Sequence, residues 1–226
     1  MTLILGIDDA GRGPVIGPMI LAGVLLTKEQ EKILSKENIK DSKLLSHKER
    51  IRVSEIIKKN SVKYYITRTF PGEIDSSLKN GINLNTLEAI KTAEIINALN
   101  NKKENIHVMI DCPSTNILNW KNKVIKLIKH NSNLDIKCEH KADFNYKHVS
   151  AASILAKVAR EEEIDKIRKQ YKEYGEVGSG YPADPTTKEF LIKRGETLSN
   201  SGIFRKSWST WKKLFPEKEQ KTLGEF

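Results

Sequence analysis

Five short apolar runs, most of them followed by stretches with helical periodicity, constrain the fold of this chain more than any other feature. The predicted strands are at 3–7, 18–26, 62–70, 106–110 and 134–139. The predicted helices are at 45–59, 83–100, 120–130, 146–171 and 207–215. Strands that repeatedly precede helices indicate an α/β sheet. Because little helix separates the first two strands, we expect a hairpin start and a mixed five-stranded sheet flanked by helices.

Charge gives the first indication of a partner. Lysine and arginine number 39 against 29 acidic residues, so the formal net charge is +10 and the pI about 9.4. Such a charge suits a polyanion, and nucleic acid is the commonest one. A lysine-rich surface can also serve solubility alone, so charge by itself leaves both interpretations open.

The location of the protein is predicted from three features. No apolar run approaches the ~18–20 residues that span a bilayer. The first residues run into Asp8 and Asp9 without a basic segment, which argues against a secretory signal. Two cysteines, Cys112 and Cys138, are too few for a disulfide framework. We therefore expect a cytoplasmic protein with both thiols reduced.

Four aspartates fall at or just beyond the ends of predicted strands. Asp8 and Asp9 follow the first strand, Asp111 follows the fourth, and Asp143 lies shortly after the fifth. Ligands collect at the carboxyl ends of parallel strands, so these side chains are expected to converge. Converging carboxylates repel one another unless cations screen them, and hard divalent ions such as Mg²⁺ prefer oxygen ligands. The alternative is that each aspartate is a cap or turn residue.

Asp8 and Asp9 raise a geometric difficulty, because neighbours in an extended strand point to opposite faces. Both can face one site only if the chain leaves the strand at this point. Gly11 and Gly13 provide that freedom, since glycine adopts positive φ at little cost.

The segment from Gly11 to Gly17 superficially resembles a dinucleotide-binding loop. The third glycine of that fingerprint would fall at Ile16, and a predicted strand follows instead of a helix. We therefore interpret the segment as a loop whose glycines leave the backbone accessible, with Arg12 beside the acids. Such a loop suits close contact with a sugar or phosphate.

Five ordered blocks of the sequence resemble the motifs of ribonuclease HII, the type 2 ribonuclease H. They are GIDDAGRGP at 6–14, DSKLL at 41–45, ID at 110–111, KAD at 141–143 with VSAASILAKV at 149–158, and GSGYPADP at 178–185. The FRKSW segment at 204–208 resembles the C-terminal region of the family's archaeal branch.

The resemblance implies an RNase H-like fold with a small C-terminal helical extension. It implies that Asp8, Asp9, Asp111 and Asp143 are the catalytic residues and hold two Mg²⁺ or Mn²⁺ ions. The implied activity is hydrolysis of RNA in RNA–DNA hybrids and cleavage 5′ of a ribonucleotide embedded in duplex DNA. The implied products carry a 3′-hydroxyl and a 5′-phosphate. A related DNA nuclease or resolvase with the same acids is an alternative.

The resemblance also implies a group that senses the RNA-to-DNA junction, namely Gly11, Arg12, Gly13 and Tyr181, and a phosphate contact at Lys43. The 2′-hydroxyl distinguishes RNA from DNA. Backbone N–H and C=O groups of a bare loop could read it, while an aromatic ring packs on the adjoining deoxyribose. Without the resemblance, Tyr181 would be interpreted as an ordinary packing residue.

One position departs from the family, which normally has Asp-Glu where this chain has Asp8 and Asp9. Aspartate is one methylene shorter, so its carboxylate is drawn back by roughly 1.3–1.5 Å. A misplacement of ~1 Å can cost on the order of a hundredfold in rate. We therefore expect Asp9→Glu to raise activity unless the backbone compensates. A hybrid-binding module with weakened catalysis is the alternative.

The last residues resemble the peptide that docks on PCNA-type sliding clamps, with Gln220, Leu223 and Phe226 at its characteristic positions. One helical turn would present Leu223 and Phe226 to a hydrophobic pocket; a solvated tail is the alternative. The predicted division is a catalytic domain at 1–194, a helical extension at 195–219 and a clamp-binding tail at 220–226. A monomer is expected.

Two further patterns predict packing rather than chemistry. Ala152, Ala156 and Ala159 share one stripe of the long predicted helix, which indicates close approach to the sheet. Trp208 and Trp211, three residues apart, are expected to pack the last helix on the main domain.

Overall fold

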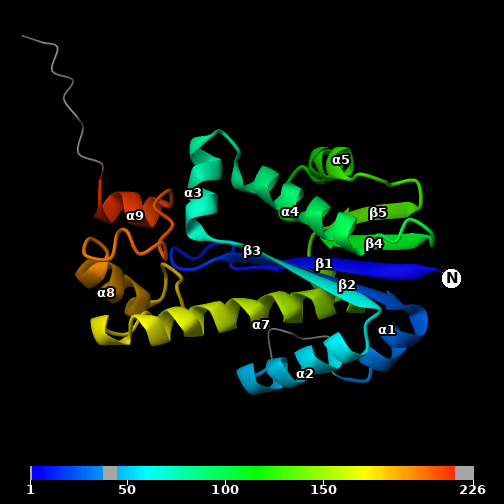
Figure 1. Cartoon of the computed structure of the whole chain (residues 1–226), viewed down its shortest axis with the longest axis horizontal. Helices are drawn as coiled ribbons and strands as arrows, with labels where there is room; N and C mark the ends of the chain where they lie inside the picture. Colours follow the sequence, from blue (N-terminus) through cyan, green and yellow to red (C-terminus); the bar gives the residue numbers. More distant parts are fainter. Residues whose placement is uncertain (1, 38–44, 217–226) are drawn as a thin grey trace, which may run out of the picture.

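The computed structural model describes residues 2–37 and 45–216. Its core is a mixed five-stranded sheet with the strand order β3-β2-β1-β4-β5 (Figure 1). The strands are β1 (Leu3–Ala10), β2 (Met19–Thr27), β3 (Lys63–Thr69), β4 (Ile106–Asp111) and β5 (Leu134–Glu139). β2 pairs antiparallel with β1 and β3, whereas β4 pairs parallel with β1 and β5. The predicted hairpin start and mixed sheet are confirmed.

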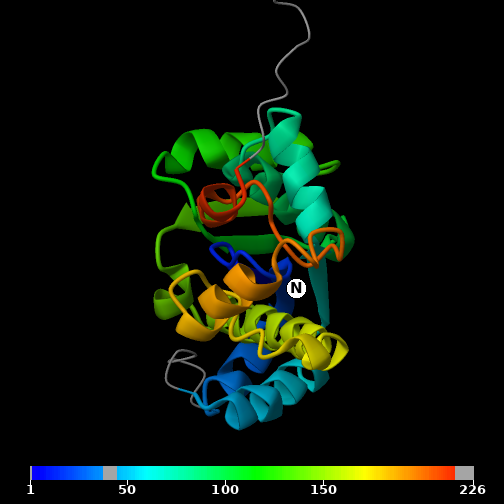
Figure 2. The same cartoon turned by 90° about the vertical axis from the view of Figure 1, so that its left-hand side faces the viewer.

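Helices cover both faces of the sheet and one of its ends. α3, α4 and α5 lie on one face, and α1, α2 and α7 lie on the other (Figure 1). Figure 2 shows α8 and α9 in front of the end of the sheet at which β1 finishes. The helices are α1 (Lys28–Leu34), α2 (His47–Lys59), α3 (Pro71–Lys79), α4 (Leu84–Leu99), α5 (Ile117–Leu127), α6 (Ala142–Asn145), α7 (Lys147–Gln170), α8 (Pro185–Arg194) and α9 (Ser209–Leu214).

Several boundaries differ from those predicted. β1 continues to Ala10 rather than ending at Ile7, so its two aspartates lie inside the strand. Pro71, directly after the third predicted strand, begins α3, and Pro185 begins α8; neither helix was predicted. Proline lacks an N–H and has a fixed φ near −65°, and both properties suit the first turn of a helix. The short helix α1 was also not predicted.

Alternate residues of β1 face two separate hydrophobic cores. Leu3, Leu5 and Ile7 belong to a cluster that includes residues of α4 and α5. Ile4 and Ala10 belong to a cluster that includes residues of α7. The predicted alanine stripe is confirmed as core, because its members on α7 are buried in this second cluster. By the same alternation, the even-numbered side chains of β1 face α7 and the odd-numbered ones face α4.

α7 approaches β1 so closely that a glycine is required at the contact. A Cβ atom placed on Gly6 would lie 2.2 Å from the carbonyl carbon and oxygen of His148. Both atoms belong to backbone, so they can give way only if the helix moves. Gly6 thereby sets the distance between β1 and the first turns of α7.

Gly6→Ala is therefore expected to lower the free energy of unfolding by about 1–3 kcal/mol, the usual cost of overpacking. Gly72→Ala is the matched control, because a Cβ there meets no atom within 4 Å and Gly72 lies in the first turn of α3. The control should be neutral or slightly stabilising. Urea denaturation of both variants measures the difference, and equal stabilities would contradict the close contact.

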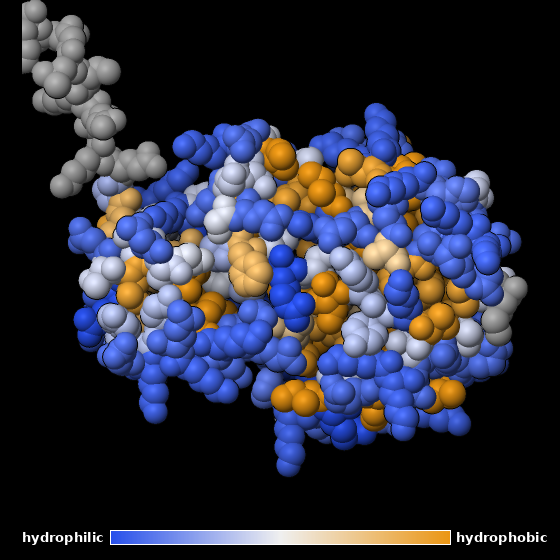
Figure 3. Space-filling model, viewed as in Figure 1, coloured by the Kyte–Doolittle hydropathy of each residue, from blue (hydrophilic) through white to orange (hydrophobic). Residues whose placement is uncertain are grey.

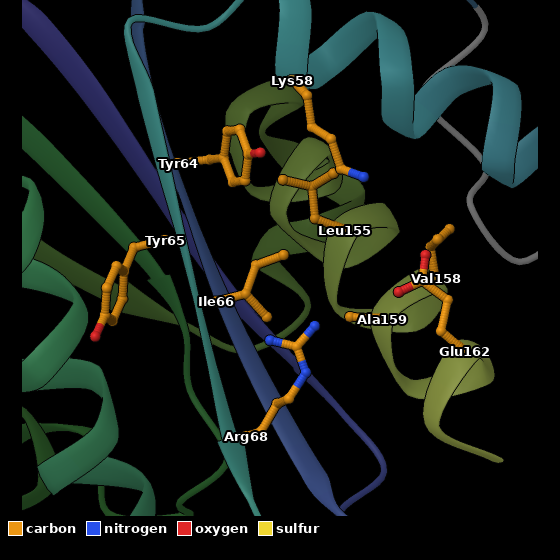
Figure 4. Close-up of a pocket in the computed structure, with 9 residues that line it drawn as sticks. All are labelled: Lys58, Tyr64, Tyr65, Ile66, Arg68, Leu155, Val158, Ala159 and Glu162. Carbon is orange, nitrogen blue, oxygen red and sulfur yellow. The ribbon is translucent and has the colours of Figure 1, made fainter. Parts of the chain in front are cut away.

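β3 is an edge strand whose side chains also alternate (Figure 4). Tyr64 and Ile66 point toward α7. Tyr65 points to the opposite side, where its hydroxyl donates a hydrogen bond of 3.3 Å to Glu94. A recess of about 320 Å³ lies between β3, α2 and α7. None of the described residues that line it belongs to the predicted active site.

A third apolar cluster joins the loop after β1 to the C-terminal segment. Val15 and Ile16 pack with Phe190, Phe204 and Trp211. The rings of Phe204 and Trp211 lie 4.8 Å apart between centroids. This cluster has members on both sides of the predicted boundary after residue 194. The division into domains stays a prediction, and α9 confirms the last predicted helix.

The surface is largely hydrophilic in the view of Figure 3, with hydrophobic residues visible in smaller groups. Within the described ranges, α-helices that combine enough length and apolarity to traverse a bilayer are absent. Cys112 and Cys138 are both buried, and neither is bonded to the other in the structure.

Candidate active site

β1 carries the first two acids into the site from within the strand. Asp8 is paired with Ala22 and Asp9 with Leu21 in the β1–β2 ladder. The expectation that the chain leaves the strand at these residues is therefore wrong. Asp8 is buried, 6% exposed, and its Oδ1 accepts the N–H of Asp9 at 2.7 Å. Ser153 on α7 lies beside Asp8, in agreement with the strand alternation.

β4 supplies the third acid and positions the fourth. Asp111 ends the strand, and its Oδ1 accepts the N–H of Ala142 at 2.7 Å. Ala142 is the first residue of α6, and Asp143 follows it. The chain turns into α6 at Lys141, whose φ of 58° is left-handed. A carboxylate at the end of one strand thus fixes the start of the short helix that carries Asp143.

Asp9 lies within electrostatic reach of each of the other three acids. Burial raises the pKa of Asp8 well above its usual value, and the charges of Asp9 and Asp111 raise it further. Burial likewise raises the pKa of Asp9 to about 6, against the opposing effect of Arg12. The charges of Asp111 and Asp143 add to this second shift. The site therefore holds excess negative charge, which a bound cation would stabilise.

The donor chemistry of the site fits a hard divalent ion such as Mg²⁺ or Mn²⁺, because every predicted ligand is a carboxylate. The side chains do not yet form a ligand set. In the part of the chain that the structure describes, no three His, Cys, Asp or Glu side chains converge closely enough to hold a metal ion. One oxygen of Asp111 is also engaged with Ala142. Asp8, Asp9 and Asp111 nevertheless line one small hollow together with Glu88.

A hollow of about 260 Å³ beside Asp9 brings together most of the predicted substrate-binding residues. Gly11, Arg12, Gly13 and Tyr181 all line it. Tyr181 is 39% exposed, and a Cβ on Gly13 would lie 3.7 Å from its ring. The ring therefore faces the loop and the hollow, which argues against a role in core packing.

Two cationic residues of α7 complete this hollow, and their roles were not predicted from the sequence. Lys157 and Arg160 line it together with Glu161. The Arg160 guanidinium lies over the ring of Tyr181, 4.7 Å from its centroid, and donates to the carbonyl of Ser179 at 2.6 Å. Lys157 belongs to the fourth sequence block, and a residue three positions further shares its helix face. The three-residue spacing from Lys157 could therefore have predicted that Arg160 lines the same hollow.

Arg160 also explains why position 11 is glycine. The backbone of Gly11 has a φ of +82°, a conformation that suits glycine. A Cβ at this position would lie 2.6 Å from Cδ of Arg160. The loop can therefore lie against α7 only with a bare backbone.

The side chain of Arg12 is anchored to α4. It forms an ion pair with Glu88 and donates to Oδ1 of Asn85 at 2.5 Å. Glu88 is 1% exposed, and burial raises its pKa to about 8, with the charge of Asp9 adding to the shift. This anchoring leaves the loop backbone to contact a ligand. The sequence signal for Glu88 was an acid on the apolar face of a predicted helix.

Some predicted residues cannot be placed. Lys43 and the tail residues Gln220, Leu223 and Phe226 lie outside the described residues. Their roles as phosphate and clamp contacts stay predictions.

The comparison with protein families identifies the chain. A family model described as ribonuclease HII matches residues 5–211, which include the four acids and the hollow. The chain belongs to the ribonuclease HII family. A ribonuclease HII from Methanococcus maripaludis is 43% identical over 227 residues, covering 98% of this chain and 90% of that protein. One from Methanocaldococcus jannaschii is 39% identical over 233 residues, covering 98% of each.

Solved structures agree with this assignment. The ribonuclease H2 of Pyrococcus horikoshii matches with a TM-score of 0.81 and 34% identity, over 94% of this chain and 96% of that one. A structure of a PCNA–ribonuclease HII complex from Archaeoglobus fulgidus matches with a TM-score of 0.78 and 34% identity, over 99% and 100%. The RNase H-like fold and the family resemblance are confirmed. As a member of this family, the chain is a metal-dependent nuclease that hydrolyses phosphodiester bonds.

Proposed function

We propose that this protein hydrolyses RNA in RNA–DNA hybrids and cuts 5′ of a ribonucleotide embedded in duplex DNA. The observation that carries the proposal is the hollow in which Asp9 meets the Gly11–Gly13 loop and Tyr181. An acid suited to metal binding thus lies beside backbone groups that can contact a sugar. A 2′-hydroxyl bound by that backbone would bring the adjacent phosphate to the acids.

Asp8, Asp9, Asp111 and Asp143 would hold two Mg²⁺ or Mn²⁺ ions. Two such ions, when bound, supply an activated water and stabilise the leaving oxygen of an in-line displacement. The buried position of Asp8 excludes water from one side of the cluster. Cleavage would leave a 3′-hydroxyl and a 5′-phosphate.

The remaining residues of the hollow would orient the nucleic acid. Tyr181 offers an exposed ring face to the deoxyribose beyond the junction, and Arg160 supports that ring. Lys157 adds positive charge near Asp9, as a phosphate contact requires. Lys43 would hold a further phosphate.

The test is a cleavage assay on three duplexes of one sequence: an RNA–DNA hybrid, a DNA duplex with one ribonucleotide, and an all-DNA duplex. We expect cleavage of the first two with Mg²⁺ or Mn²⁺, none of the third, and none in EDTA. End analysis should find a 3′-hydroxyl and a 5′-phosphate.

Two other results would replace the proposal. Cleavage of the all-DNA duplex would indicate a related DNA nuclease. Binding of the hybrid in EDTA without cleavage in either metal would indicate a hybrid-binding module in which Asp9 has weakened catalysis.

We further propose that the tail binds a PCNA-type sliding clamp, as the A. fulgidus relative was solved in a complex with PCNA. Deleting residues 220–226 should abolish clamp binding in a pull-down and leave cleavage of a short hybrid unchanged. Leu223→Ala should reproduce the loss, whereas Thr222→Ala should not, because only Leu223 matches the motif. Retained clamp binding by the deletion variant would refute the assignment.

A cytoplasmic location and a monomeric state remain part of this proposal. The two free, buried thiols favour a reducing compartment. Size-exclusion chromatography with light scattering would test the oligomeric state.

A further inference from the structure

The three carbonyl groups of the Gly11–Gly13 loop all accept hydrogen bonds from side chains of the C-terminal segment. Arg205 donates to the carbonyl of Gly11 at 2.6 Å and to that of Arg12 at 2.9 Å. Trp208 donates through Nε1 to the carbonyl of Gly13 at 3.1 Å. The loop and this segment are nearly 200 positions apart in the chain, so the fold alone brings them together.

Arg205 is held rigidly in this position. Its side chain is 0% exposed, its Nε donates to the carbonyl of Gly17 at 3.0 Å, and its guanidinium lies 4.8 Å from the centre of the Trp208 ring. Asp75 of α3 fixes the next residues by accepting the N–H groups of Lys206 (2.8 Å) and Ser207 (3.0 Å). Burying a guanidinium is costly unless its donors are satisfied. Here the donors are satisfied by loop carbonyls.

The geometry of the peptide bond converts these contacts into an orientation of the loop. In a trans peptide the C=O of one residue and the N–H of the next point in opposite directions. A Gly11 carbonyl that points to Arg205 therefore turns the N–H of Arg12 away from it. The Arg12 carbonyl does the same for the N–H of Gly13. Among the described residues, no backbone carbonyl accepts either N–H.

We propose that Arg205 is a positioning residue for substrate recognition, supported by Trp208. By binding the carbonyls of Gly11 and Arg12, it holds the N–H groups of Arg12 and Gly13 outward as paired donors for oxygen atoms of a ribonucleotide. This inference rests on the proposed function. It also makes the C-terminal segment a part of the recognition site.

The test measures the preference for a ribonucleotide, expressed as the ratio of the Kd of an all-DNA duplex to that of the same duplex with one ribonucleotide, both in EDTA. In Arg205→Lys we expect this ratio to fall about tenfold. A single ammonium group cannot replace the planar guanidinium group, which donates to three carbonyls. The Kd of the all-DNA duplex should stay within about twofold, because phosphate contacts are unchanged. A purely structural role would instead weaken both affinities together.

Trp208→Phe gives a second, milder variant that keeps the ring beside Arg205 and removes only the bond to Gly13. We expect its ratio to fall about two- to threefold. Trp211→Phe is the matched control, because it is the same change one helical turn away and Trp211 packs on Phe204 rather than on the loop. Its ratio should equal that of the wild type.

The outcomes separate this inference from the proposed function. A wild-type protein without preference for the ribonucleotide overturns the proposed function, and the inference with it. A wild-type preference that persists in folded Arg205→Lys overturns the inference alone. Where circular dichroism shows Arg205→Lys to be unfolded, Trp208→Phe decides, and a ratio equal to that of Trp211→Phe overturns the inference.

Discussion

Asp8→Asn is expected to abolish cleavage and at the same time to stabilise the folded protein against urea at neutral pH. The loss of activity should be about a thousandfold or more, since the transition-state stabilisation that metal ions provide is worth several kcal/mol. The gain in stability follows from the surroundings of the carboxylate. Asp8 is buried beside Asp9 and Asp111, and its charge is unfavourable in the metal-free protein.

The direction of this stability effect with pH follows from the raised pKa of Asp8. Burial and the neighbouring carboxylates raise that pKa above its value in the unfolded chain. The wild-type protein therefore loses stability as the pH rises through the folded-state pKa, and the uncharged asparagine does not. The advantage of Asp8→Asn should be present at neutral pH and shrink in acid. Asparagine can still accept the N–H of Asp9 through its amide oxygen.

Urea denaturation in EDTA at several pH values, together with cleavage in Mg²⁺ and Mn²⁺, measures both effects. Asp135→Asn is the matched control, because Asp135 is a half-exposed aspartate on β5 that pairs with His107. It should leave cleavage unchanged. An Asp8→Asn protein that keeps wild-type cleavage would remove Asp8 from the catalytic residues.

Asp9→Glu is expected to raise the rate of hybrid cleavage, by up to about a hundredfold. The family normally has glutamate at this position, and the shorter side chain holds its carboxylate further from the other acids. In the structure no three of these acids converge, although Asp9 lies within electrostatic reach of Asp111 and Asp143. One added methylene would extend its carboxylate into the hollow that Asp9 already lines.

Single-turnover cleavage of a hybrid by wild type, Asp9→Glu and Asp8→Glu tests this expectation. Asp8→Glu adds the same methylene where the side chain is buried against α7, so it should lower the rate. A faster Asp9→Glu protein together with a slower Asp8→Glu protein would show that the length of the side chain at position 9 limits the rate. An unchanged or slower Asp9→Glu protein would mean that the backbone already compensates for the shorter side chain.

Local patterns in the sequence were sufficient to predict the five strands and the long helix α7. Strand and helix periodicities are visible within ten or twenty residues, because each element buries one side of itself. The helix-initiating roles of Pro71 and Pro185 were missed, since proline both ends strands and begins helices. The continuation of β1 through Asp8 and Asp9 was also missed. Charged residues interrupt an apolar run even where the strand is held by its neighbours.

Ordered motifs and local periodicity were enough to predict the family and the sheet, and the same motifs predict the four acids of the site. The assembly of the site around the Gly11–Gly13 loop depends instead on long-range packing. Glu88 on α4, Arg160 on α7 and Arg205 near the C-terminus contact one short loop from three separate parts of the chain. Such contacts have no local signature, since their partners meet only after the sheet and the helices on its two faces have packed.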